Sequence, residues 1–99
     1  MHYAVMTDSV EQKLRAEADH CYRWSNGPGA VYPVHDHPYR KILYVERGSI
    51  TFTPVGRVAI VMRPGDRLDL PAGTAHGAVV GQEGVACWEG QAKVRPVGA

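Results

Sequence analysis

Three histidines and a lysine are the residues of this chain whose types and spacing could do chemistry. His35 and His37 are two positions apart, and residues i and i+2 of a β-strand point to the same face of a sheet. A third histidine, His76, follows the turn-forming residues Pro71-Ala72-Gly73. Neutral imidazole is the commonest protein ligand for zinc, copper, iron and nickel. The spacing by itself leaves two interpretations open, metal ligation and exposed histidines without a ligand.

Tyr39 and Lys41 continue the parity of His35 and His37 if no bulge intervenes. A lysine amine and a tyrosine hydroxyl beside the imidazoles could bind a substrate oxygen or move a proton, so both are candidate catalytic residues. For Tyr39 the alternative is a ring that packs at the barrel mouth. Lys41 could also bind an anion.

The elements that must position these residues are predicted to be short β-strands. The chain has 11 glycines and 7 prolines, and most of them separate short β-rich runs, which is typical of an all-β sandwich or barrel. We expect strands near 21–24, 30–35, 39–45, 49–55, 57–62, 68–70, 75–80 and 85–93. One helix is predicted over 9–18, because Asp8 and Glu11 resemble a capping box and apolar residues recur every fourth position. The ion pairs Glu11–Arg15 and Lys13–Glu17 would also stabilise this helix.

Size and charge limit the function. A chain of 99 residues is expected to form one domain, residues 1–99. A net charge of +1 gives no electrostatic reason for binding nucleic acid, and no apolar run is long enough to span a bilayer. With no recognisable signal peptide, we expect a cytoplasmic protein whose Cys21 and Cys87 are reduced.

Two segments together resemble the motifs of the cupin family. The first runs from Gly29 through His35-Asp36-His37 and Lys41 to Gly48, and the second from Gly65 through Pro71 and Gly73 to His76. The resemblance implies an antiparallel jelly-roll barrel, with the three histidines inside it on facing strands and holding a divalent metal ion. Iron, manganese, nickel, zinc and copper are the candidate ions. Small proteins of this kind commonly pair as homodimers, and Ile42 and Tyr44, which face outward by parity, are candidate interface residues.

The chain departs from the family pattern at Lys41, where a typical metal-binding cupin has a glutamate ligand, and at Val80, where an asparagine is frequent. A dication beside an ammonium group is repelled by several kcal/mol, on the order of a like-charge pair in a poorly solvated site. We consider three arrangements: Lys41 loses its proton, Lys41 turns toward a carboxylate such as Glu46 or Glu89, or the pocket holds an anion and no metal.

Two functions follow as hypotheses. The first is a metal-dependent enzyme, of dioxygenase, isomerase or decarboxylase type, that acts on a small polar or anionic metabolite. The second is a metal-free protein that binds a small anion through Lys41 and the histidines. Trp24 and Trp88 are predicted to pack in the core or at an interface, with the lining of a ligand cavity as the alternative. Cys87 is predicted to be a buried unreactive thiol, and Asp66 to cap a turn.

Overall fold

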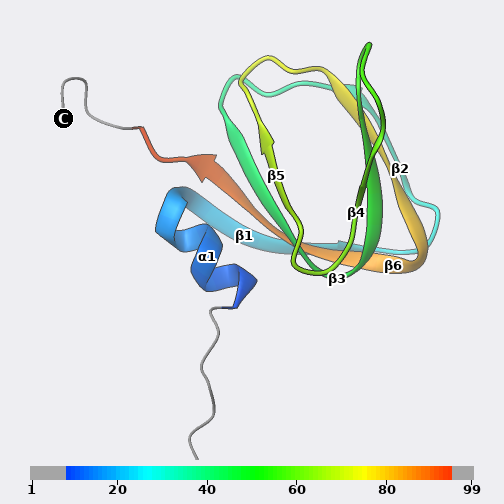
Figure 1. Ribbon diagram of the computed structural model, residues 1–99, viewed down its shortest axis with the longest axis horizontal. Coiled ribbons are helices and arrows are strands. Elements are labelled where there is room, and N and C mark those ends of the chain that lie inside the picture. The colour runs from blue at the N-terminus through cyan, green and yellow to red at the C-terminus, as the bar shows by residue number, and fades with distance from the viewer. Residues whose placement is uncertain (1–8, 95–99) are drawn as a thin grey trace, which may run out of the picture.

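The strands of this protein form a jelly-roll barrel with one helix on its outside (Figure 1). The structure is a computed structural model that describes residues 9–94. Its elements in chain order are α1 (Val10–Glu17), β1 (Ala18–Asn26), β2 (Val31–His35), β3 (Lys41–Pro54), β4 (Ile60–Met62), β5 (Arg67–Leu70) and β6 (His76–Ala92). The predicted all-β fold with one short helix is therefore confirmed.

Two long strands, β3 and β6, connect the two halves of the barrel. The first half of β3 pairs with the last half of β6, and β5 and β1 flank this pair. The second half of β3 pairs with the first half of β6, and β4 and β2 flank that pair. The sequence predicted four separate strands here, at 39–45, 49–55, 75–80 and 85–93. That prediction was wrong in detail, because β3 and β6 stay continuous through register shifts near residues 45–50.

The bend between the two halves depends on glycine at position 48. Gly48 has a φ of 73°, a left-handed conformation that residues with a Cβ seldom adopt. A Cβ built on Gly48 would overlap the carbonyl oxygen of Gly84 on the neighbouring strand. The two strands can therefore pass this closely only without a side chain at Gly48.

The interior of the barrel contains the main hydrophobic core, and the alternation predicted for residues 41–45 holds in β3. The predicted parity from His35 through His37 and Tyr39 was wrong, because residues 36–40 connect β2 to β3 and form no strand. Leu43 and Val45 are fully buried in this core, on the same side of β3 as Lys41. The other buried members are Ile50, Phe52, Met62, Leu68, Leu70, Ala78, Val80, Val85 and Cys87. Cys21 and Cys87 are both free thiols, as predicted.

The N-cap residue of helix α1 lies one position later than predicted. Ser9 is the N-cap: its hydroxyl accepts a hydrogen bond from the Gln12 backbone, and the Gln12 side chain accepts one from the Ser9 backbone. The predicted capping box of Asp8 and Glu11 was therefore wrong, and Asp8 itself lies outside the described residues. Glu11 and Arg15 form the predicted ion pair. Among residues 9–94 no helix is long and apolar enough to cross a bilayer.

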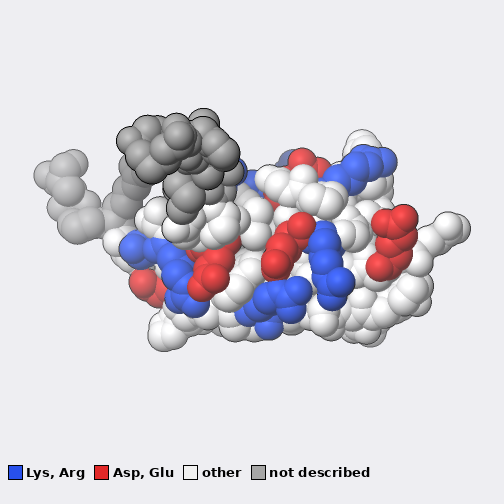
Figure 2. Space-filling view, turned by 90° about the horizontal axis from the view of Figure 1, so that it is seen from below, with Lys and Arg blue, Asp and Glu red and all other residues white. Residues whose placement is uncertain are grey.

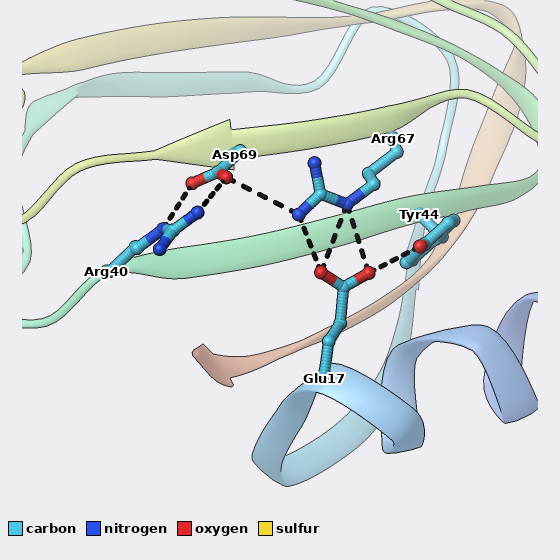
Figure 3. A network of polar contacts seen from close by, with 5 residues as sticks. All are labelled: Glu17, Arg40, Tyr44, Arg67 and Asp69. Carbon is cyan, nitrogen blue, oxygen red and sulfur yellow. Dashed lines mark hydrogen bonds and ion pairs between the residues drawn. The ribbon is translucent and has the colours of Figure 1, made fainter. Parts of the chain in front are cut away.

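The C-terminal end of α1 is fixed to the sheet by Glu17 (Figure 3). Its carboxylate accepts hydrogen bonds from the Arg67 guanidinium, at 2.6 Å for the shortest, and from the Tyr44 hydroxyl at 2.5 Å. Arg67 also contacts Asp69, which pairs with Arg40. Glu17 therefore serves as an anchor to the sheet, whereas the sequence had paired it with Lys13.

The helix covers the outer face of β3 that was predicted to form a dimer interface. Ile42 and Tyr44 do point outward, but they pack against Leu14 and Ala18 and are 1% and 7% exposed. The predicted outward direction is confirmed, but the choice of these two residues for a dimer interface was wrong because the helix occupies that face. Charged side chains of both signs stand next to one another across the face of the molecule shown in Figure 2.

Candidate metal centre

The three predicted histidines converge at one end of the barrel, where His76 is buried, His37 is half-buried and His35 is exposed. His35 ends β2 and lies directly opposite His76, the first residue of β6. The His35 and His76 ring centroids are 4.5 Å apart, and the His37 ring lies 4.9 Å from His35 and 5.5 Å from His76. One nitrogen from each ring lies within 4.8 Å of the other two. Strand pairing thus brings together residues that are about forty positions apart.

Backbone carbonyls fix the orientation of two of these rings. Nδ1 of His35 lies 2.7 Å from the Pro33 carbonyl oxygen, and Nδ1 of His76 lies 2.8 Å from that of Thr74. A carbonyl oxygen can only accept, so Nδ1 of each ring carries the proton and donates it. Each Nε2 is left with a free lone pair. This is the tautomer in which metal-binding histidines are usually held, with a hydrogen bond at the other nitrogen.

Two of the histidine nitrogens are buried without a partner. Nε2 of His37 and Nε2 of His76 make no hydrogen bond within the described residues, and an unsatisfied buried acceptor costs about 1–3 kcal/mol. Burial lowers the pKa of both rings, and the Lys41 charge lowers that of His37 further. Neutral rings with free lone pairs are the form that binds a cation. The residues therefore fit a divalent metal ion.

Lys41 forms an ion pair with a buried carboxylate, which is one of the three arrangements considered from the sequence. Its Nζ lies 3.2 Å from Oε1 of Glu89, and the two side chains are 7% and 6% exposed. Glu89 also accepts hydrogen bonds from the Tyr22 hydroxyl at 2.8 Å and from Nε1 of Trp24 at 2.6 Å. The other proposed partner, Glu46, pairs instead with Arg23. The Lys41–Glu89 pair adds no net charge to the pocket.

Tyr39 lies beside the histidines but outside the cavity lining. Its ring centroid is 5.1 Å from that of His37, with an angle of 33° between the planes, and the side chain is half-buried. Burial raises the pKa of the Tyr39 hydroxyl, and the Glu89 charge raises it further. The position agrees with the packing alternative, and a catalytic role for Tyr39 stays a prediction.

A cavity of about 320 Å³ opens onto the histidines and Lys41. The residues that line it are Tyr22, Trp24, Ser25, Tyr32, His35, His37, Lys41, Ile50, Phe52, His76, Ala78 and Glu89. Trp24 packs against the main core, as predicted, and it also forms part of this wall, which was the alternative considered from sequence. The sequence did contain a signal, because Tyr22 and Trp24 share the parity of one strand face, but nothing local showed that this face pointed inward.

The other residues considered from sequence lie away from the cavity. The ring of Trp88 packs on the outer face, where Arg15 lies 5.6 Å from its centroid. Asp66 accepts a hydrogen bond from the Arg63 backbone at 2.8 Å, which confirms the predicted turn cap. Cys87 is fully buried, and burial raises the pKa of its thiol to about 12. It is therefore unreactive at neutral pH, as predicted.

Known proteins share both the sequence pattern and the fold of this chain. A family model described as "Cupin domain" matches residues 22–88. No curated protein matches the chain. Two solved structures are similar: a cupin-like protein from Thermotoga maritima (26% identity, TM-score 0.64) and an RmlC-like cupin from Shewanella frigidimarina (27% identity, TM-score 0.65). The alignments cover 72% and 76% of this chain and 55% and 66% of those chains.

A third similar structure is KdgF from a Halomonas species, with 26% identity and a TM-score of 0.61. The alignment covers 74% of this chain and 68% of that one. The chain thus spans between about half and two thirds of the length of these relatives.

Proposed function

Because this chain belongs to the cupin family, we propose that it is a metal-dependent enzyme that acts on a small polar or anionic metabolite. His35, His37 and His76 would hold one divalent ion. The observation that carries the proposal is the pair of buried Nε2 atoms, of His37 and His76, that have no partner among the described residues. A cation between the three rings would satisfy both.

Three histidines without a protein carboxylate leave coordination positions free for substrate, which is typical of catalytic rather than structural sites. When bound, the ion would supply Lewis acidity and polarise a substrate oxygen. The chain's own residues would then bind and orient the substrate within the cavity of about 320 Å³.

Lys41 is the residue that we propose contacts the substrate directly. An ammonium group has three N–H donors, and Glu89 is its one ion-pair partner among residues 9–94. Lys41 lines the cavity, so a remaining donor can bind a substrate carboxylate or hydroxyl oxygen. Glu89 is held by Tyr22 and Trp24 and would position the amine.

The charge balance of the cavity favours the metal over the metal-free alternative. A pocket that selects an anion without a metal needs excess positive charge. Here the carboxylate of Glu89 offsets Lys41, and burial holds the pKa of His37 and His76 below the ordinary value. The lining without an ion is therefore close to neutral, and a dication would supply the charge that attracts an anionic substrate.

The metal content of the untagged protein tests the proposal. We expect about one equivalent of a divalent ion by mass spectrometry, in line with one three-histidine site, and its loss in His76→Ala. The matched control is His20→Asn, since His20 is an exposed histidine outside the motifs, and this variant should keep its metal. If the protein takes up none of iron, manganese, nickel, zinc or copper, the metal proposal is wrong and the anion-binding alternative replaces it.

A charge variant sharpens the test. Lys41→Met removes the ammonium and leaves the Glu89 carboxylate facing the cavity, so the metal should bind more tightly in competition with a chelator. Unchanged or weaker affinity would show that Lys41 and the ion do not interact.

The assembly and location of the protein stay predictions. The predicted homodimer is checked by sedimentation velocity, where a monomer at micromolar concentration would contradict it. The cytoplasmic location is checked by cell fractionation.

A further inference from the structure

The cavity contains a slot that the histidine site does not explain. Ala78 on β6 pairs with Tyr32 of β2 on one side and with Phe52 of β3 on the other, and all three residues line the cavity. Neighbouring strands are about 4.8 Å apart, so the Cα atoms of the two aromatic residues are separated by about 9.6 Å. A small side chain between two rings leaves space for a flat group above it.

The aromatic wall of the slot is held in place by hydrogen bonds. The Tyr32 hydroxyl accepts one from the Asn26 side chain at 2.9 Å, and Nε1 of Trp24 donates one to Glu89. The Trp24 and Tyr32 rings meet edge to face, with centroids 5.5 Å apart. Each ring is therefore held by a hydrogen bond at its polar atom, and its carbon surface is available to a ligand with little further loss of side-chain freedom.

The groups that could bind charge lie beside the slot. His76 precedes Ala78 by two residues and shares its face of β6, and His35 is its cross-strand partner. Lys41 lies on the other side, with Nζ 6.0 Å from the Phe52 ring centroid. Apart from the histidines, the acidic and basic residues of the lining are Glu89 and Lys41. Between them lie the apolar side chains of Ile50, Phe52 and Ala78, and Trp24 and the hydroxyl-bearing residues Tyr22, Ser25 and Tyr32 complete the lining.

We infer that the substrate is a small aryl carboxylic acid, whose flat ring lies over Ala78 between Tyr32 and Phe52 and whose carboxylate reaches the histidine centre or Lys41. This inference rests on the proposed function for the role of the ion, but the slot is made by the chain alone. Over Ala78 and against the Phe52 ring, a polyhydroxylated acid of similar size would lose the hydration of its hydroxyls against carbon surfaces, which is unfavourable without hydrogen-bond partners there.

Ligand selectivity of the unmodified protein is the first test. Phenylacetate, gluconate and benzyl alcohol are titrated by calorimetry into the protein as purified, with its metal content measured in the same sample. Phenylacetate should bind at least about tenfold more tightly than gluconate, which lacks the ring, and than benzyl alcohol, which lacks the charge. Gluconate binding as tightly as phenylacetate overturns the inference.

The position of the ring is tested by fluorescence and by filling the slot. In a Trp88→Phe background Trp24 is the remaining tryptophan, and phenylacetate should change its emission. Ala78→Leu should weaken phenylacetate binding at least about tenfold with unchanged metal content, since the added carbons occupy the slot. Ala72→Leu, at an exposed turn, is the matched control and should bind normally.

The two proposals fail separately. Full metal occupancy with no preference for phenylacetate overturns the aryl slot and leaves the metal centre intact. Absence of metal with retained preference for phenylacetate overturns the metal centre, and Lys41 then receives the carboxylate. Should Ala78→Leu not fold, the ligand comparison on the unmodified protein decides the inference.

Discussion

Glu89 inside the barrel and Glu17 outside it use similar partners in different surroundings. Each carboxylate accepts a hydrogen bond from a tyrosine hydroxyl, Tyr22 or Tyr44, and each pairs with a basic side chain. The Lys41–Glu89 pair is 7% and 6% exposed, whereas the Arg67–Glu17 pair is 39% and 31% exposed. The difference shows what burial adds to an ion pair: the outer pair can exchange each partner for water, and the inner pair cannot.

The largest effect on stability is expected when one charge of the inner pair is removed. Glu89→Gln keeps the shape but leaves the Lys41 ammonium buried without a counter-charge, and we expect a loss of about 3–5 kcal/mol in the free energy of unfolding. Denaturant unfolding followed by circular dichroism measures it. The double variant Lys41→Met with Glu89→Gln removes both charges and should recover most of the loss. A double variant as unstable as the single one would contradict this account.

Breaking the outer pair should lower the free energy of unfolding by a smaller amount. Arg67→Met removes the guanidinium that binds Glu17, and we expect a loss of about 1 kcal/mol or less, because water can solvate the freed carboxylate. The same unfolding measurement applies. Arg63→Met, at an exposed turn position, is the control and should leave stability unchanged. A cost for Arg67→Met equal to that of Glu89→Gln would remove the contrast between the two sites.

The outer network also predicts a pH dependence. Hydrogen bonds from Arg67 hold the pKa of Glu17 below its ordinary 4.5, and those from Arg40 hold the pKa of Asp69 below its ordinary 3.8. The unfolded chain therefore binds protons more readily, so this stabilisation is complete above about pH 5 and is lost as pH falls through the lowered pKa values. Unfolding measured from pH 6 to pH 3 should show a smaller decline in Glu17→Gln than in the unmodified protein. Equal slopes would contradict the assignment.

The smallest effect is expected at the most exposed pair. Glu11 and Arg15 lie one helical turn apart with 41% and 54% exposure, and Glu11→Gln should change stability by about 0.3–0.5 kcal/mol. Addition of 1 M salt should reduce that difference, since the screening length falls to about 3 Å and both side chains are exposed. A difference that persists in salt would indicate a packing role for Glu11.

Much of the site could be predicted from sequence, because spacing carries that information. His35 and Lys41 face the cavity, and Leu43 and Val45 lie on the same side of β3 as Lys41, as strand alternation predicts. The i, i+2 argument does not hold for His37, because residues 36–40 connect β2 to β3 and form no strand. The turn at Asp66 and the buried state of Cys87 also followed from local residue types. Such features depend on a few neighbouring residues, so the sequence contains nearly all that determines them.

Partners distant in the chain could not be identified in the same way. The sequence named Glu46 and Glu89 as alternatives for Lys41, and only the pairing of β3 with β6 put Glu89 inside and Glu46 outside. The same limit led to the wrong choice of Ile42 and Tyr44 as interface residues, and it left the two alternatives for Trp24, core packing and cavity lining, open.

By itself, then, the sequence determined the fold family, the inward face of β3 and the residue types available for chemistry, because these are set by short-range periodicity and turn geometry. The tertiary structure alone decided which carboxylate neutralises Lys41, where α1 lies, and that aromatic rings flank Ala78. These depend on how strands distant in the chain pair and bend, and no local pattern of residues records that.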